Sequence, residues 1–547
     1  MNTIDIIGEE QAFNTIVDRS IETFEDDILT RIGNYAFYKC FNLTTVSFPN
    51  VTSISNSAFQ NCYNLTSVSF PNATIIGSSA FGNCSKLIDA NFPSVTNISD
   101  CAFINCMSLT TANFPKVTSI GTNAFGNCHN LTTISFPSAT NISTSAFYKC
   151  SGLTDANFPN AIFIRANAFN YCSGLTTISF PNVTTISNTA FNYCSGLTTI
   201  SFPNVTSIGN GAFQSCYSLI SISFPNVTSI GSNAFYACSS LTSVSFPKVT
   251  SISNSAFAYC SNLTNANFPS VTYIGSSAFA SCYNLTTISF PNATYIGYTA
   301  FHYCSSLTTA SFPNVTSIDD RVFFSCNNLT TANFPKVTSI RATAFGNCHN
   351  LTTISFPNVT SINTEAFYNC DNLISISFPK VTYINSSVFC ECFNLTNANF
   401  PSATYIGNSA FRSCYSLTTI SFPNVTSIGS NVFESCSGLT SISFPSIQTI
   451  GSDAFRACKF ISSAYLPMVN TICNDAFVGC TSLTRIDILA SSVCILASTA
   501  VFWGTPIRSS TYTGSFGSIY VPASLVSNYK TANVWSGLAD RITAYTE

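Results

Sequence analysis

The strongest constraint on the fold is a repeat of 22 residues that runs through most of the chain without insertion or deletion. Proline recurs at this step from Pro49 to Pro467, which gives 20 positions, and cysteine recurs from Cys40 to Cys480, which gives 21. A phenylalanine stands three residues before each of these cysteines. A fixed period of this length is typical of repeat proteins, in which each unit contacts only its neighbours.

The apolar residues of one unit show how the chain is expected to fold. Leu65, Val68 and Phe70 have the spacing of a short strand. Ile76 and Cys84 follow at steps that match neither a continuous helix nor a single strand, so the unit is predicted to be a coil that turns several times. One coil buries too few apolar side chains to offset the entropy of ordering its backbone, so coils must stack. We therefore expect one β-rich repeat solenoid of about 20 to 21 coils, instead of the several globular domains that 547 residues would suggest.

The unit resembles the BspA-like class of the leucine-rich repeat superfamily, whose repeat reads L-x-x-I-x-x-P-x-x-V-x-x-I-G-x-x-A-F-x-x-C. Leu65 to Cys84 matches this pattern, and the resemblance covers about residues 33–487. Two features depart from it, because the period is 22 residues instead of about 23 and phenylalanine replaces the aliphatic residue before proline. The resemblance implies a right-handed, leucine-rich-repeat-like solenoid. It also implies a role in adhesion, because BspA-like proteins are generally surface adhesins of host-associated microbes.

The N-terminal segment, residues 1–32, is predicted to cap the solenoid 33–487 or to attach the chain to another protein or another copy. It holds eight of the 22 acidic residues. A short helix is expected over Glu9 to Arg19 and a capping strand over Ile21 to Phe24. Solenoids need caps because their terminal coils expose an apolar face. The sequence leaves open whether the segment is a cap, an attachment site or both.

The C-terminal segment, residues 488–547, is predicted to be the second cap. Ile519 to Pro522 is expected to form a last strand, and Leu525 to Ile542 is expected to form an amphipathic helix. Trp503 and Trp535 are expected to seal the last coil.

The repeating cysteines are predicted to be reduced, buried side chains, since unpaired cysteine is among the most buried residue types. Neighbours in the stack would lie about 5 Å apart, within reach of a disulfide, but an odd number of them cannot pair completely. The chain has no C-x-x-C motif and no set of converging zinc ligands, so no metal and no other cofactor is expected. The first members of the series are Cys40, Cys62, Cys84, Cys106, Cys128 and Cys150. Four cysteines lie outside it, Cys101, Cys390, Cys473 and Cys494, of which Cys390 is expected to face solvent.

Charge and histidine content exclude several classes of function. Only 7% of the residues are charged, and 19 basic against 22 acidic residues give a net charge of −3, which argues against nucleic-acid binding. The three histidines, His129, His302 and His349, are dispersed, whereas acid–base catalysis needs groups within hydrogen-bond reach. No catalytic residue and no enzymatic activity is therefore expected. The uncharged run Ile488–Gly504 is too short and polar for a membrane span, and no secretory signal is visible at Met1.

Threonine and tyrosine dominate the predicted surface. Threonine fills 17 of the 21 positions equivalent to Thr44, and a second series begins at Thr52. These hydroxyls suit a soluble strand face, and they would also suit binding to glycans or, as a regular array, to ice. Tyrosines cluster around the repeating cysteine, where they either pack between coils or bind ligand. These are Tyr63, Tyr148, Tyr171, Tyr193, Tyr217, Tyr236, Tyr259, Tyr283, Tyr303 and Tyr415.

Two tyrosine pairs are the best candidates for ligand contacts. Tyr273 and Tyr295 stand in consecutive coils, and Tyr383 and Tyr405 repeat the arrangement five coils later. An exposed tyrosine offers a flat apolar face with a polar tip, which suits sugar rings and protein surfaces. The other interpretation of these pairs is packing between coils.

Two functions follow from these features. The first is a non-enzymatic recognition or adhesion protein that binds a host glycan or host protein through its hydroxyl- and tyrosine-rich surface, with weak contacts adding by multivalency. The alternative is a structural or receptor-binding fibre or tail component of a phage or similar particle, which suits the acidic N-terminal segment. The expected location is the cell surface, the secreted fraction or a virion, by an export route that the sequence does not identify.

Overall fold

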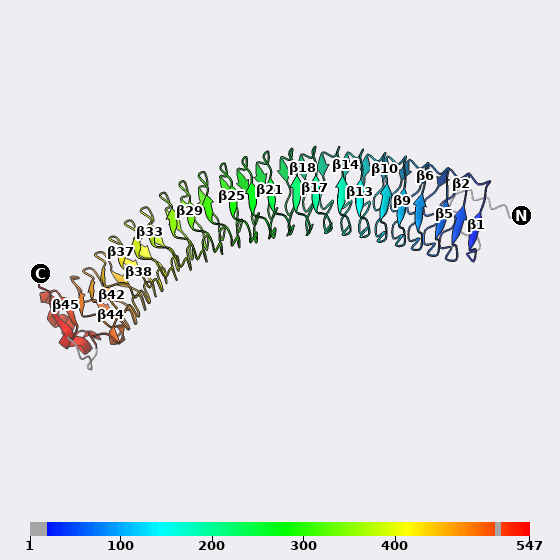
Figure 1. The fold of residues 1–547 in the computed structure, drawn as a ribbon. Coiled ribbons are helices and arrows are strands. Elements are labelled where there is room, and N and C mark those ends of the chain that lie inside the picture. The colour runs from blue at the N-terminus through cyan, green and yellow to red at the C-terminus, as the bar shows by residue number, and fades with distance from the viewer. Residues whose placement is uncertain (1–18, 509–515, 547) are drawn as a thin grey trace. The chain divides into compact units, whose positions relative to one another are not determined.

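The computed structural model describes residues 19–508 and 516–546, and the chain divides into two compact units, Met1–Val271 and Thr272–Glu547. In each unit the coils stack side by side in chain order (Figure 1). The predicted parallel-stranded repeat solenoid is confirmed, because consecutive coils pair in parallel at a register of 22 residues. The division between the units falls inside the repeat, where the consensus sequence continues unchanged.

Each coil of the first unit contributes one strand of three residues and one of two. The longer strands are β1 (Thr23–Glu25), β3 (Thr45–Ser47), β5 (Ser67–Ser69), β7 (Asp89–Asn91), β9 (Thr111–Asn113), β11 (Thr133–Ser135), β13 (Asp155–Asn157), β15 (Thr177–Ser179), β17 (Thr199–Ser201), β19 (Ser221–Ser223), β21 (Ser243–Ser245) and β23 (Asn265–Asn267). The shorter strands are β2 (Arg31–Ile32), β4 (Ser53–Ile54), β6 (Ile75–Ile76), β8 (Asn97–Ile98), β10 (Ser119–Ile120), β12 (Asn141–Ile142), β14 (Phe163–Ile164), β16 (Thr185–Ile186), β18 (Ser207–Ile208), β20 (Ser229–Ile230) and β22 (Ser251–Ile252).

The second unit repeats this arrangement up to its C-terminal cap. Its shorter strands are β24 (Tyr273–Ile274), β26 (Tyr295–Ile296), β28 (Ser317–Ile318), β30 (Ser339–Ile340), β32 (Ser361–Ile362), β34 (Tyr383–Ile384), β36 (Tyr405–Ile406), β38 (Ser427–Ile428), β40 (Thr449–Ile450), β42 (Thr471–Ile472) and β44 (Ile495–Leu496). Its longer strands are β25 (Thr287–Ser289), β27 (Thr309–Ser311), β29 (Thr331–Asn333), β31 (Thr353–Ser355), β33 (Ser375–Ser377), β35 (Asn397–Asn399), β37 (Thr419–Ser421), β39 (Ser441–Ser443), β41 (Ser463–Tyr465) and β43 (Arg485–Asp487).

The number of coils is slightly larger than predicted. The pairs β1/β2 to β43/β44 make 22 coils of two strands, against the expected 20 to 21. The additional coil is β1 and β2, which lie within the segment assigned to a cap, and β1 pairs with β3 in the same register as the rest of the repeat. The helix expected over Glu9 to Arg19 lies outside the described residues, apart from Arg19 itself, which is in a turn.

Two series of buried phenylalanines form the core. Phe59 stacks on Phe37 and Phe81, with ring centroids 4.9 and 5.2 Å away, and Phe48 stacks on Phe70 at 5.4 Å. Rings of the two series meet edge to face, as Phe59 and Phe70 do at 5.8 Å. Offset stacks and edge-to-face contacts are the favourable geometries for aromatic rings. Phenylalanine before proline therefore serves as the second partner of each edge-to-face contact.

Every coil from Tyr35 to Gly479 turns through two residues with positive φ, which lie four positions apart. Asparagine tolerates this left-handed conformation better than most residues. It fills the second of these positions in four consecutive coils, Asn61, Asn83, Asn105 and Asn127, and their side-chain amides form a chain of hydrogen bonds of 2.7 to 2.8 Å.

The C-terminal cap differs from its prediction. The expected last strand is β45 (Ser518–Val521), which pairs with β43 and with β46 (Ile542–Ala544). The single helix expected over Leu525 to Ile542 is wrong, because the chain forms several short helices instead. These are η3 (Ala523–Leu525), α1 (Val526–Thr531) and η4 (Trp535–Arg541), and η2 (Thr499–Phe502) precedes them.

The break in that helix has a local cause. Val534 adopts a φ of 68°, which no continuous α-helix allows, and Ser536 and Gly537 are poor helix formers. Trp535 is buried and donates from Nε1 to the carbonyl of Cys494 at 2.6 Å, so it does cover the last coils. Trp503 is 68% exposed, and its predicted role as a seal is wrong.

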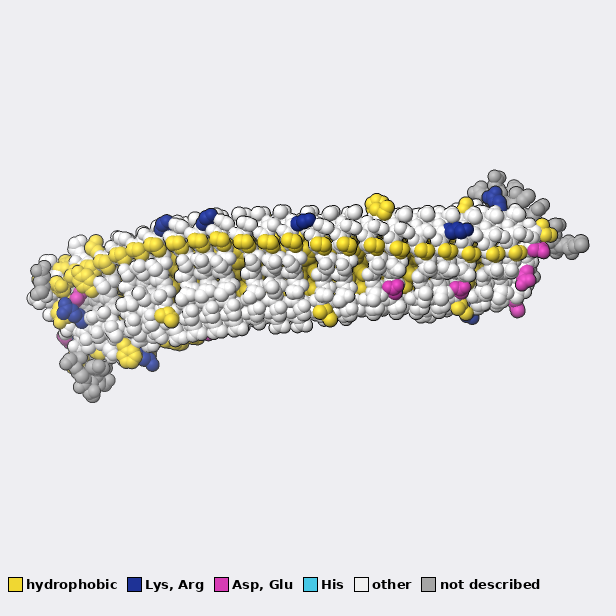
Figure 2. Space-filling model, turned by 45° about the horizontal axis from the view of Figure 1, so that its top comes forward, with side chains coloured by type: hydrophobic (Ala, Val, Ile, Leu, Met, Phe, Trp, Pro, Cys, Tyr) yellow, Lys and Arg dark blue, Asp and Glu magenta, His cyan; other side chains and the backbone are white. Residues whose placement is uncertain are grey.

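The surface carries few charges. Figure 2 shows a face of mostly uncharged polar atoms, with scattered charged side chains and one thin line of hydrophobic side chains. Pro49 and its equivalents are the apolar residues that every coil leaves half-buried or exposed in the same place. Neutral polar side chains therefore make up most of the surface that a partner would meet.

Candidate functional site

Tyr273 and Tyr295, predicted as ligand contacts, face each other across strands β24 and β26. Their rings stack with centroids 4.9 Å apart and planes 11° apart. The Tyr295 hydroxyl donates to Oδ2 of Asp319 at 3.0 Å, and Arg341 bonds Oδ1 of the same carboxylate at 3.1 Å. Burial and the contact with Asp319 raise the pKa of Tyr295. Tyr273 is 42% exposed, so the pair presents aromatic surface to solvent.

Tyr383 and Tyr405 form the same arrangement in strands β34 and β36. Their centroids are 4.7 Å apart, with 19° between the planes, and Tyr383 is 49% exposed. Ser361 and Ser427 hold the equivalent positions in the flanking coils, so small side chains border the pair. The structure brings each predicted pair together but not the two pairs, which lie five coils apart, about 24 Å at the usual strand spacing.

The threonine hydroxyls are used inside the fold. Thr66 Oγ1 donates to the carbonyl of Thr44 at 3.0 Å, and Thr74 Oγ1 donates to the carbonyl of Thr52 at 3.0 Å. The same pattern continues in later coils, as at Thr132. Each of these hydroxyls has one proton, which it donates to a backbone carbonyl of the preceding coil. The hydroxyl oxygens of the threonine series can therefore accept hydrogen bonds from a ligand. They cannot donate one, because their protons are already donated within the fold.

The repeating cysteines are fully buried, and each thiol lies against the preceding coil. Cys62 Sγ donates to the carbonyl of Phe37 at 3.0 Å, and Cys84 Sγ makes the equivalent bond to Phe59 at 3.2 Å. All 25 cysteines are free thiols in the structure. Burial raises the pKa of Cys128 from 9.0 to about 12, which keeps the thiol protonated and unreactive.

The four other cysteines differ in exposure. Cys101 and Cys473 are half-buried, and Cys494 is buried in the C-terminal cap. Cys390 was expected to face solvent, but it is only 4% exposed. It follows Phe389 at a repeat position where other small residues, Ala258 and Ala280, are also buried.

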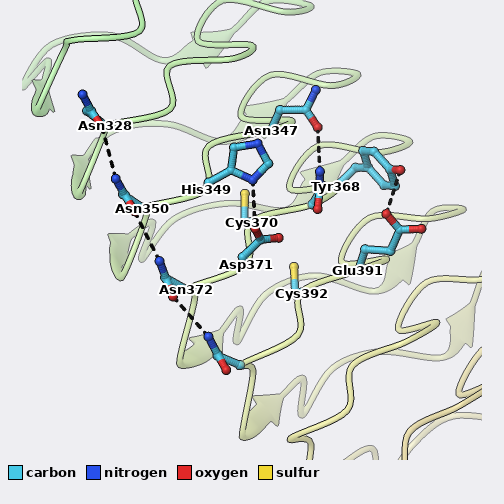
Figure 3. Close-up of polar contacts among 12 residues, drawn as sticks. Asn328, Asn347, His349, Asn350, Tyr368, Cys370, Asp371, Asn372, Glu391 and Cys392 are labelled. Atoms are coloured by element: carbon cyan, nitrogen blue, oxygen red, sulfur yellow. Dashed lines mark hydrogen bonds and ion pairs between the residues drawn. The ribbon is translucent and has the colours of Figure 1, made fainter.

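Polar side chains in one row of the second unit bond to each other from coil to coil (Figure 3). Asn328, Asn350, Asn372 and Asn394 form a chain of amide hydrogen bonds of 3.1 to 3.3 Å. Beside it, His349 Nδ1 lies 2.9 Å from Oδ2 of Asp371. These hydrogen bonds join side chains of neighbouring coils. His349 therefore contacts a carboxylate and is not directed at an open site.

A hollow of about 390 Å³ lies in the first unit and was not predicted from the sequence. One row of its lining is His129, Ser151, Ser173, Ser195 and Tyr217, which occupy a single repeat position in five consecutive coils. A second row is Lys149, Tyr171 and Tyr193. We name this hollow the Ser–Tyr groove.

Aromatic rings give the Ser–Tyr groove its apolar character. The rings of Tyr171 and Tyr193 stack at 4.6 Å, and Tyr148 and Tyr217 contact them edge-on at 6.0 and 6.5 Å. The tyrosines were noted in the sequence individually and His129 was considered only for catalysis, whereas the serines and Lys149 were missed. The available signal was the triplet Cys-Ser-Gly in three consecutive coils, at Cys150, Cys172 and Cys194.

In residues 19–508 and 516–546, no three His, Cys, Asp or Glu side chains are grouped so that they could hold a metal ion. None of the helices in these ranges has the length and apolar composition needed to cross a membrane.

A sequence model of a protein family matches nearly the whole chain. The sequence model described as "BspA type Leucine rich repeat region (6 copies)" matches residues 6–132, 96–218, 184–308, 294–418 and 404–523. No curated protein matches the chain.

Solved structures of leucine-rich repeat proteins are also similar. A leucine-rich repeat protein from Bacteroides ovatus is 26% identical over 70% of this chain and 87% of that chain, with a TM-score of 0.41. A leucine rich cell surface protein from Faecalibacterium prausnitzii is 25% identical over 73% of this chain and 84% of that chain, with a TM-score of 0.28. A leucine-rich repeat protein from T. pallidum is 30% identical over 34% of this chain and 89% of that chain, with a TM-score of 0.27.

Proposed function

The chain belongs to the BspA-type leucine-rich repeat family, and we propose that it is a non-enzymatic recognition protein that adheres to a glycan or protein of a host surface. The proposal includes an extracellular location, on a cell surface or in secreted form. The observation that carries it is the two stacked tyrosine pairs, Tyr273/Tyr295 and Tyr383/Tyr405, each of which has one exposed member, Tyr273 or Tyr383. They stand where most other coils carry serine, threonine or asparagine.

Core packing does not require these tyrosines. The residue that follows each of them, such as Ile274 or Ile384, is the one buried in the core. Small polar residues at the same position in other coils support the same strand pairing, as Ser317 and Ser339 do. The tyrosines therefore add exposed aromatic surface to a strand that forms without them, which suits contact with a partner.

The arrangement also favours binding that depends on several contacts. Each pair spans two coils and is too small to hold a partner tightly by itself. Two pairs on one stack of coils raise the effective concentration of the second contact once the first has formed. A surface with repeated epitopes, such as a glycan coat or a fibrous host protein, would use both pairs together.

The test compares binding of the full chain with that of a variant in which Tyr273, Tyr295, Tyr383 and Tyr405 are replaced by alanine. Both are applied to glycan arrays and to host cells and extracellular-matrix proteins. The variant should keep its circular dichroism spectrum and lose at least tenfold in apparent affinity. Tyr465→Ala is the matched control, because Tyr465 is exposed on a strand but has no tyrosine in the adjacent coils at its position. Equal binding by the quadruple variant and the unchanged chain would remove these tyrosines as the site.

A further inference from the structure

We propose that the Ser–Tyr groove binds an oligosaccharide of two or three sugar units that carries one carboxylate, with the carboxylate next to Lys149 and His129. The inference rests on the proposed recognition function, since it assigns a second site and a ligand class to it. Three observations carry it: a bounded shape, a local positive charge and available hydroxyls.

The tyrosine row occupies backbone positions that do not suit its residue types. Lys149, Tyr171 and Tyr193 have φ values of 59, 63 and 57°. The left-handed region costs most non-glycine residues about 1 kcal/mol or more, and asparagine is the residue that tolerates it best. In the four preceding coils this position is asparagine, and it forms the hydrogen-bonded series that ends at Asn127. The positive φ recurs at this position in every coil, and Ala237 and Tyr259 adopt it outside the groove, so it describes the lining without selecting a ligand.

The groove has two defined ends. Ser151, Ser173 and Ser195 are small, and the larger His129 and Tyr217 hold the same repeat position before and after them. Gly152 follows the first serine, and a Cβ there would come within 2.6 Å of the carbonyl oxygen of His129. Three coils at the usual strand spacing give a length of about 14 Å, and 390 Å³ is within the range of small-molecule sites. This length suits two or three linked sugar rings.

Charge in the groove selects the ligand further. Lys149 is exposed, with its ammonium 5.2 Å from the ring centre of Tyr148 and 5.9 Å from that of Tyr171. No carboxylate is among the lining residues. One full positive charge matches a saccharide with a single carboxylate, whereas a heavily sulfated chain would need a broad basic patch, and the whole chain is net negative.

The serine hydroxyls remain available to sugar hydroxyls. Ser151 Oγ and Ser195 Oγ make only long contacts of 3.5 Å, to the carbonyls of His129 and Ser173. These contrast with the threonine hydroxyls, which bond at 3.0 Å in Thr66 and Thr74. An apolar wall of tyrosine next to weakly engaged hydroxyls fits a sugar ring, which presents C–H groups on its faces and O–H groups around its rim.

A related coil in the second unit shows that the combination of histidine, lysine and serines is not a property of the repeat consensus. His349 occupies the same repeat position as His129 and is preceded by an identical Phe-Gly-Asn-Cys sequence. The next coil carries Asp371, which lies 2.9 Å from His349, where the groove has Ser151. The carboxylate there lies against Nδ1 of the histidine, and among the described residues only the first unit combines histidine, lysine and serines at these positions.

The experiment is isothermal titration of the full chain with two matched pairs of sugars, cellobiouronate against cellobiose and sialyllactose against lactose. At least one acidic sugar should bind at least tenfold more tightly than its neutral counterpart. Lys149→Met should remove this preference and leave the neutral sugar unchanged. Tyr171→Asn and Tyr193→Asn should weaken both sugars, while circular dichroism and thermal unfolding show that the fold is kept, because asparagine suits positive φ.

Tyr259→Asn is the matched control, since Tyr259 is exposed and has a φ of 62° at the same repeat position but lies outside the groove. It should bind sugar like the unchanged chain. Equal affinity for acidic and neutral sugars, a preference for sulfated lactose over sialyllactose and cellobiouronate, or an acid preference that survives Lys149→Met would overturn the proposal. If the groove variants bind normally while the quadruple tyrosine variant does not, the groove is wrong and the proposed function stands. If no host surface and no sugar binds, both are wrong.

Discussion

Removal of one ring from the phenylalanine core should destabilise the chain strongly and locally. Phe169 is fully buried and stacks on Phe147 at 5.2 Å and on Phe191 at 5.3 Å. It also meets Phe158 and Phe180 edge to face at 5.8 and 5.7 Å. Phe169→Ala therefore removes a buried side chain and four aromatic contacts.

The expected cost is about 4–5 kcal/mol, at the upper end of the usual range for Phe→Ala in a core. The upper end applies because the fixed register of 22 residues prevents neighbouring coils from collapsing into the cavity. The loss is measured from urea-induced unfolding, and its position is measured by hydrogen exchange. Amides in the two or three coils on either side of Phe169 should exchange faster, because coils of a repeat protein are stabilised mainly by their neighbours.

Phe163→Ala is the matched control for this experiment. Phe163 lies six residues earlier and is 46% exposed, and its ring centre lies 4.9 Å from the guanidinium of Arg165. Its replacement should cost less than about 1 kcal/mol. The reasoning is refuted if Phe169→Ala costs no more than Phe163→Ala, or if protection falls evenly in every coil of the unit.

Three further predictions concern the thiols, the cap and one tyrosine. Burial raises the pKa of Cys128 and of Cys480 from 9.0 to about 12, so in the unfolded chain these thiols ionise first and unfolding releases protons. The contribution of these thiols to the free energy of unfolding should therefore be constant up to about pH 8 and fall as the pH rises from 9 towards 12. An unchanged urea midpoint between pH 8 and pH 10 would contradict this. Trp535→Ala should lower the free energy of unfolding by about 3–5 kcal/mol and make the C-terminal cap sensitive to limited proteolysis. Trp503→Ala should leave the digestion pattern unchanged, because Trp503 is 68% exposed. Asp319→Asn should lower the pKa of Tyr295 towards its ordinary value in an ultraviolet titration, since the contact with Asp319 is one of the causes that raise it, and a pKa that stays high would show that burial alone is responsible.

The periodic part of the fold was predictable because every coil repeats one pattern of apolar residues. The apolar steps in Leu65 to Cys84 predicted the longer strand of each coil, most of the buried positions and the stacking, but not the shorter strand at Ile75–Ile76. The tyrosine pairs were predictable for the same reason, because a step of 22 residues places Tyr273 against Tyr295.

The aperiodic parts were not predictable in this way. The break in the C-terminal helix depends on the conformation of Val534 and on packing of Trp535 against Tyr529, neither of which the apolar spacing encodes. The Ser–Tyr groove exists because small residues leave a space between larger ones. The spacing of apolar residues predicts which side chains fill the core, and it does not predict a space left at the surface. The burial of Cys390 depends on its size, because Ala258 and Ala280 are also buried at this repeat position whereas Arg412 is exposed and Glu434 is half-buried there.

The parallel register has a mechanical consequence within each unit. Strand hydrogen bonds point from one coil to the next, as at Val46↔Val68, so a pull along the stacking direction loads these interfaces in series. Interfaces of similar strength in series yield one at a time, and each release adds a segment of 22 residues, roughly 70–80 Å when extended. A unit tethered at both ends would lengthen by successive increments under tension and limit the peak force on whatever it holds.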